Sequence, residues 1–97
     1  MATLNLDGAT FKSVHVPTER TNILFVKAAG GFVGCGYFDI AVANRVGDAV
    51  AIVTGVKTID DLLAAPIVRL SDRAREAGVT EGMSGREALL LLQTAGQ

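Results

Sequence analysis

The chain has only one cysteine and one histidine. One cysteine excludes an internal disulfide, and one cysteine with one histidine is too few for a zinc site built from these residue types. No apolar run reaches the roughly 18 residues that a membrane-spanning helix needs, and the first residues do not form a signal peptide. We therefore expect a cytoplasmic protein that holds no metal and has no membrane partner.

The chain also has no excess of positive or negative charge. Nine basic residues stand against ten acidic ones, the net charge is −1, and neither sign forms a block. Domains that bind nucleic acids usually carry a basic stripe, so the sequence predicts no nucleic-acid partner.

Aromatic residues are few, yet the chain is apolar. It has no tryptophan, but 49% of its residues are hydrophobic and the mean hydropathy is +0.39. A domain of 97 residues builds only a modest core, so a monomer would leave part of this apolar surface exposed. We expect that surface to be buried between copies of the chain, in a homo-oligomer.

Alternating apolar residues predict antiparallel strands in the N-terminal part. The turn dipeptide Asp7-Gly8 and the polar loop Pro17 to Thr21 separate them. The predicted strands are Leu4 to Leu6, Phe11 to Val16 and Ile23 to Ala28. Early strands such as Phe11 to Val16 have an edge that needs a partner.

The stretch Gly30 to Val56 holds the cysteine, the tyrosine and the longest apolar run. Ala29-Gly30-Gly31 predicts a turn, because glycine reaches positive φ without steric cost. Phe32 to Phe38 alternates as a strand, with Gly34 and Gly36 on one face. These two glycines leave that face bare, which predicts close packing of a backbone, a helix or a ligand against it.

Helix signals follow this strand. Asp39 can cap a helix from Ile40 to Val46, and Gly47 can close it in the left-handed conformation. The run Ala49 to Val53 has no polar residue on either face, which suits a strand buried on both sides.

The last third of the chain predicts three short helices and one strand. Their ranges are Ile59 to Ala65, Ile67 to Leu70 (the strand), Asp72 to Ala77 and Ser84 to about Thr94. Thr58 and Ser71 are the predicted caps of the first two helices, and a capping box from Ser84 to Glu87 opens the last. Leu89 to Leu92 spread over roughly 300° of the final helix. That helix is therefore either sandwiched within its own chain or in contact with a second chain.

These elements predict one α+β domain over residues 1–97, with an N-terminal antiparallel sheet, short helices and a buried central strand. Residues 1–38 are mainly β and are expected to mediate oligomerisation, whereas residues 39–97 mix helices and strands.

Cys35 is the first candidate site residue. It could serve as a nucleophile or redox thiol if a nearby cation or histidine lowered its pKa, and His15 could then act as its base. Free cysteine is more often a small buried apolar residue, and a histidine on a strand beside a polar loop is more often solvated. We favour the structural interpretation for both residues.

A second group of candidates flanks the buried central strand. Asn44 and Asp48 precede it, and Thr54 and Lys57 follow it. Polar residues at the ends of a central strand often form ligand sites in α/β folds, although Asn44 and Asp48 could equally cap loose backbone groups. The neighbouring glycines fit neither a dinucleotide fingerprint nor a phosphate loop, so no cofactor is predicted.

Three segments resemble a known family. They are Gly34-Cys35-Gly36-Tyr37, Gly47-Asp48-Ala49-Val50-Ala51 and Gly82-Met83-Ser84-Gly85-Arg86-Glu87-Ala88, and together they resemble the YunC-like family of small bacterial and archaeal domains of unknown function. The resemblance covers Ile23 to Leu92, most of the chain. It implies an α+β fold whose N-terminal β region mediates tetramer formation, and it implies no reaction, cofactor or catalytic residue.

Two functional hypotheses remain open at this point. The first is a non-catalytic homo-oligomeric module, a tetramer, that binds a partner or a small ligand. The second is a small enzyme that depends on Cys35.

Overall fold

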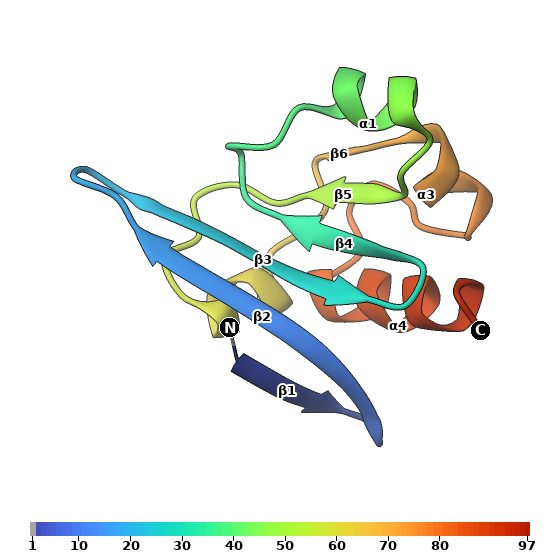
Figure 1. The fold of residues 1–97 in the computed structure, drawn as a ribbon, viewed down its shortest axis with the longest axis horizontal. Coiled ribbons are helices and arrows are strands. Elements are labelled where there is room, and N and C mark those ends of the chain that lie inside the picture. Colours follow the sequence, from blue (N-terminus) through green and yellow to red (C-terminus); the bar gives the residue numbers. More distant parts are fainter. Residues whose placement is uncertain (1) are drawn as a thin grey trace.

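One mixed sheet runs through the molecule, and helices pack on both of its faces (Figure 1). The computed structural model describes residues 2–97, so residue 1 of the predicted domain lies outside the described residues. Six strands lie side by side in chain order: β1 (Ala2–Leu6), β2 (Ala9–Pro17), β3 (Asn22–Ala28), β4 (Gly31–Gly34), β5 (Val50–Ile52) and β6 (Arg69–Leu70). The predicted α+β class is confirmed.

Four helices accompany the sheet: α1 (Ile40–Val46), α2 (Ile59–Ala64), α3 (Asp72–Glu76) and α4 (Gly85–Ala95). The longest, α4, has 11 residues, and within residues 2–97 no helix combines the length and apolarity that a membrane crossing requires.

The two faces of the sheet carry different cores. On one face, Leu24, Val26 and Val33 pack with residues of α2 and α4 in the main core. On the other face, α1 covers only β5, where Ala43 packs with Val50 and Ile52. The buried run through β5 is therefore covered on both sides, as its unbroken apolar sequence predicts.

Strands β4 and β5 form the parallel pair of the sheet, and α1 connects them. The local signals for this crossover are confirmed. The side chain of Asp39 accepts a hydrogen bond from Ala41 N at 2.8 Å, and Gly47 ends α1 with φ of 87°.

Ser71 does more than cap α3. Its side chain is fully buried and accepts from Ala74 N, as the sequence predicts, but it also accepts from Val50 N at 2.9 Å and donates to Asp48 O at 2.8 Å. One hydroxyl therefore joins the start of β5 to the start of α3.

The strand predicted from Phe32 to Phe38 is shorter in the structure. β4 ends at Gly34, and residues 35–38 form a turn in which Phe38 N donates to Cys35 O at 3.3 Å. The turn brings the Phe38 ring back over Gly34, where it packs against Phe25 and Phe32 with ring centroids 5.5 and 5.2 Å away.

The predicted reason for the Ala29-Gly30-Gly31 turn was wrong, although the turn is present. Neither Gly30 nor Gly31 has positive φ. A Cβ on Gly30 would lie 2.5 Å from Leu92 O, and one on Gly31 would overlap Ala49 O. Glycine is needed at both positions because other backbone segments pack directly against the turn.

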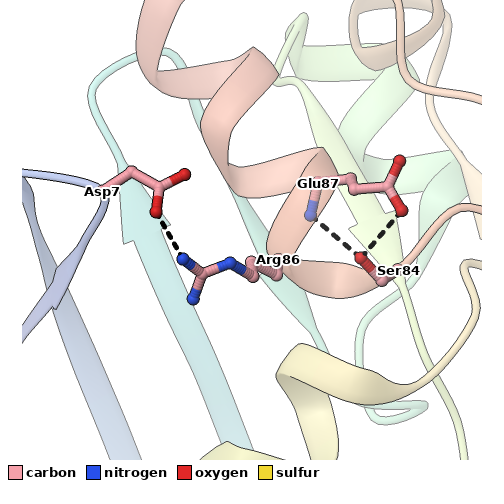
Figure 2. A network of polar contacts seen from close by, with 4 residues as sticks. All are labelled: Asp7, Ser84, Arg86 and Glu87. Atoms are coloured by element: carbon pink, nitrogen blue, oxygen red, sulfur yellow. Dashed lines mark hydrogen bonds and ion pairs between the residues drawn. The ribbon is translucent and has the colours of Figure 1, made fainter.

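The N-terminal hairpin is tied to α4 by an exposed ion pair, Arg86 to Asp7, at 2.6 Å (Figure 2). Beside it, Ser84 Oγ accepts from Glu87 N and also bonds to the Glu87 carboxylate. Half of the predicted capping box is therefore present: Ser84 caps the helix, but the Glu87 carboxylate accepts from the Ser84 hydroxyl and not from the Ser84 amide.

The structure bears on two further expectations, one about the edge of the second strand and one about the leucines of the last helix. β2 has β3 on one side and, from Ala9 to Ser13, β1 on the other. The predicted edge of Phe11 to Val16 is therefore covered at Phe11 to Ser13 and stays open, within the described residues, at Val14 to Val16. In α4, Leu89 and Leu92 are fully buried, and Leu90 and Leu91 pack against the main core as partly buried side chains. All four leucines therefore contact the chain's own core, although Leu90 and Leu91 keep part of their surface exposed.

Candidate functional site

A pocket of about 400 Å³ opens where the parallel strands β4 and β5 end. Because β3 runs antiparallel to β4, the start of β3 lies at this same end of the sheet. Three segments line the pocket: Thr21 and Asn22, then Cys35, Gly36 and Tyr37, then Gly55, Val56 and Lys57. The carboxyl ends of parallel strands are a common place for ligand sites, and this volume suits a small molecule.

Cys35 lies in this pocket as a nearly buried residue, 5% exposed. Its Sγ lies 3.9 Å from Asn22 O, and its amide donates to Leu24 O across the strand pair. The thiol is free. A short turn follows it at once, so the residue stands at the rim where β4 gives way to a loop.

His15 does not pair with Cys35. The register places His15 opposite Leu24 on β3, and Leu24 in turn lies opposite Cys35, so a whole strand separates the two. Two strand spacings amount to roughly 10 Å. His15 is exposed and its Nε2 lies 2.8 Å from Asn22 Oδ1, which means that the imidazole donates this hydrogen bond.

Several hydrogen-bond donors of the residues that line the pocket have no acceptor within the protein. Within residues 2–97, the amides of Gly36, Tyr37, Gly55 and Val56 donate to no protein acceptor. Asn22 uses its Oδ1 on His15, which leaves its Nδ2 as a donor. The Lys57 ammonium belongs to neither of the two ion pairs in the described part of the chain.

The four predicted ligand-binding residues fall at opposite ends of β5. Asn44 and Asp48 are at its start, where Asn44 Oδ1 accepts from Asp72 N at 2.8 Å and the Asp48 carbonyl accepts from Ser71. Lys57 lies at the other end and lines the pocket, and Thr54 stands beside it next to Gly36. The structure therefore does not bring the four together.

The two predicted close-packing glycines differ from each other. A Cβ on Gly34 would lie 2.6 Å from the Phe38 ring, so the bare patch there is filled by the chain's own aromatic side chain. A Cβ on Gly36 would meet only Thr54 Cγ2, at an ordinary 3.6 Å. Close packing is therefore found at Gly34 and not at Gly36, because the turn after Gly34 leads the chain away from the sheet.

Sequence reasoning missed most of the pocket wall. Thr21 was predicted only as the end of a polar loop, and Asn22, Gly55 and Val56 were given no functional role. Each segment has an ordinary turn signal. The sequence order alone does not indicate that the three loops lie together in the fold. The one available signal was the prediction of a strand, helix and strand in succession, which is typical of a parallel pair with its site at the carboxyl ends.

Comparison with known proteins gives consistent matches. Residues 34–92 match the family described as "Domain of unknown function (DUF1805)". The chain is 38% identical over 89 residues to the uncharacterized protein YunC of Bacillus subtilis (strain 168), covering 88% of each protein. It also resembles the crystal structure of TA1206, a protein of unknown function from Thermoplasma acidophilum, with a TM-score of 0.89 and 31% identity over 94% of this chain and 89% of that one.

The matched region begins at Gly34 and ends within α4, so it contains both the Cys35 turn and the loop after β5. It also covers the three segments whose resemblance to YunC-like proteins the sequence suggested. The chain therefore belongs to the DUF1805 family of YunC-like domains of unknown function.

Proposed function

We propose that the chain is a non-catalytic homo-oligomeric module that binds a small ligand in the pocket at the carboxyl ends of β4 and β5. The observation that carries the proposal is this pocket itself, where three loops converge around unpaired donors and an apolar wall made of Cys35, Val56 and the Tyr37 ring. Such a mixture of apolar surface and a few placed polar groups is typical of small-molecule sites.

The oligomeric part of the proposal rests on one face of the N-terminal sheet. We call it the apolar sheet face, and it consists of Val14, Val16, Ile23 and Phe25. The main-core helices pack on the opposite face. On this side the Phe38 ring covers part of Phe25, and within residues 2–97 no helix covers Val14, Val16 and Ile23. Val16 is 51% exposed. A second copy of the chain would bury this face, and two distinct self-complementary contacts would give the proposed tetramer.

A cysteine-dependent enzyme is the alternative, and one observation favours it. Cys35 lines the same pocket, beside the unpaired amides of Gly36 and Tyr37, which could stabilise a developing negative charge. Against it, the only histidine is held on the far side of β3 by Asn22, so the thiol has no base in contact. The rate of alkylation of Cys35 across pH decides between the two, because an activated thiolate would react rapidly at neutral pH.

A cytoplasmic location stays part of the proposal. It fits the free thiol of Cys35, since the cytoplasm keeps thiols reduced.

The ligand-binding proposal is tested by mapping where small uncharged molecules bind. We suggest titrating the ¹⁵N-labelled protein with benzamide and, separately, with benzyl alcohol, and following the backbone amide signals. The expected result is saturable shifts at Asn22, Gly36 and Val56, which lie on all three lining segments. Shifts confined to the groove beneath α1, around Val42 and Val46, or no saturable shifts at all, would overturn the proposal.

Two substitutions sharpen this test. Tyr37→Ala removes an exposed ring from the pocket wall and should weaken benzamide binding. Val46→Ala is the matched control, because Val46 is also exposed and lines the groove beneath α1 without touching the pocket. Tyr37 also borders that groove, so the control decides: weaker binding in Val46→Ala would place the ligand in the groove beneath α1, whereas weaker binding in Tyr37→Ala alone supports the pocket.

A further inference from the structure

We propose that the ligand of this pocket is a small organic anion whose oxoanion group, a carboxylate or a phosphate, is held by Lys57 and the unpaired backbone amides. This inference rests on the proposed function, because it names the chemical class of ligand for the same site. The juxtaposition that carries it is one unpaired ammonium and four unpaired amides around a pocket whose wall contains no carboxylate.

The charge of the wall is the first step. The chain as a whole is slightly acidic, with ten carboxylate side chains against nine basic ones. None of the ten belongs to the eight lining residues, whereas Lys57 does. Lys57 is not in either ion pair of the described residues, so its ammonium is available to a ligand. The lining residues therefore include one positive side chain and no negative one.

The backbone is the second step. Gly36 and Tyr37 are the two central residues of the turn closed by Phe38 N and Cys35 O, and their own amides have no protein acceptor within residues 2–97. The loop after β5 also has two adjacent unpaired amides, those of Gly55 and Val56. Gly55 is in the left-handed conformation, with φ of 71°. Adjacent free amides of this kind commonly hold oxyanions.

Side chains supply further donors at the same rim. The hydrogen bond from His15 fixes Asn22 with its Oδ1 turned to the imidazole, so the Nδ2 remains free to donate. Thr21 lines the pocket with a hydroxyl. The carboxylate of Asp61 accepts a hydrogen bond from Lys57 N at 3.1 Å, and Asp61 does not line the pocket.

The apolar part of the wall defines the rest of the ligand. Val56 is nearly buried, Cys35 is nearly buried, and Tyr37 presents a ring. An inorganic ion alone would leave this apolar surface in contact with water. A carboxylate or phosphate attached to a short apolar or aromatic body would use both parts of the pocket.

The test compares charged and neutral probes of the same shape. The wild-type protein is titrated at constant ionic strength with benzoate and with benzamide, and amide shifts at Gly36, Tyr37, Gly55 and Val56 are followed. We expect benzoate to bind more tightly than benzamide, and sodium phosphate to shift the same amides more weakly than benzoate. Phosphate competing with benzoate at these amides would identify the oxoanion group as the shared feature.

Lys57→Met is the decisive variant, with Lys12→Met as its control. Both changes remove one ammonium, but Lys12 lies on β2, away from the pocket. Loss of one charge-assisted contact should weaken benzoate binding about tenfold in Lys57→Met and leave it unchanged in Lys12→Met. Benzamide binding should be the same in both variants.

The outcomes separate this inference from the function on which it rests. Equal affinity for benzoate and benzamide at the pocket amides would overturn the inference that the ligand is an anion, but the pocket would still be a ligand site. Equal weakening of benzoate binding by both lysine substitutions would also overturn it, because the attraction would then be a property of the whole surface. Tighter binding of benzoate than of benzamide at these amides, reduced in Lys57→Met and kept in Lys12→Met, would support the anion.

Discussion

At the scale of single residues, glycine positions decide how the loops around the pocket are built. Gly34 and Gly36 are two residues apart and look equivalent in the sequence. In the structure, Gly34 is buried under the Phe38 ring, whereas Gly36 is exposed at the rim of the pocket. The sequence could indicate that this strand has a bare face, but not which glycine is covered, because that depends on the turn bringing Phe38 back.

This difference gives a matched pair of substitutions. Gly34→Ala should destabilise the protein by about 1–3 kcal/mol, because the new Cβ would have to displace the ring of Phe38. Gly36→Ala should leave the free energy of unfolding nearly unchanged. Urea unfolding of both variants measures this, and equal midpoints for the two would show that the packing around Gly34 is misassigned.

A second residue-scale prediction concerns the thiol. Cys35 is nearly buried and packs in the main core, so Cys35→Ala should cost about 1 kcal/mol or somewhat more. The native thiol should also react slowly with iodoacetamide at neutral pH. Rapid alkylation of the folded protein, together with unchanged stability of Cys35→Ala, would favour the enzyme alternative.

At the scale of elements, most helix boundaries could be predicted from local signals. Asp39, Thr58, Ser71 and Ser84 all cap helices as their spacing indicates. Capping chemistry is local, so a single sequence carries it. The strand from Phe32 was predicted too long, because alternation continues through Tyr37 although the last hydrogen bond to β3 comes from the Cys35 amide. Register, edges and the meeting of loops are non-local, and the pocket depends on all three.

Two of these caps predict different stability effects. Ser84→Ala should cost about 1 kcal/mol, the usual value for losing an N-cap at a surface. Ser71→Ala should cost about 2–3 kcal/mol, because it also leaves the buried Val50 amide and the Asp48 carbonyl without their partner. Thermal unfolding of the two variants compares them directly. A smaller loss for Ser71→Ala than for Ser84→Ala would contradict the role given to Ser71.

At the scale of the whole molecule, the sheet has one covered face and one partly uncovered face. The high apolar content of the sequence indicated an excess of hydrophobic surface. In the structure, Val16 is exposed on the apolar sheet face, where Val14, Ile23 and Phe25 are half-buried, and the other exposed large apolar side chains lie before or on α1 (Tyr37, Val42, Val46) and after α2 (Val68). The expectation that the leucines of α4 form a second contact loses support, since they pack within the chain.

The proposed assembly can be weighed by light scattering coupled to size-exclusion chromatography at micromolar concentration. The expected mass is about four times the 10.1 kDa of the chain. Val16→Lys, on the apolar sheet face, should lower that mass, because a charge would be buried at the contact. Val68→Lys is the control, since Val68 is also exposed but follows α2. A monomeric wild-type protein would overturn the oligomer proposal.

The proposed ligand site is tested most directly by a crystal structure of the protein soaked with benzamide. We predict density for the probe between the turn after β4 and the loop after β5, in contact with Cys35, Tyr37 and Val56. A fully occupied probe in the groove beneath α1, with the pocket between those loops empty in every copy, would contradict the proposed site.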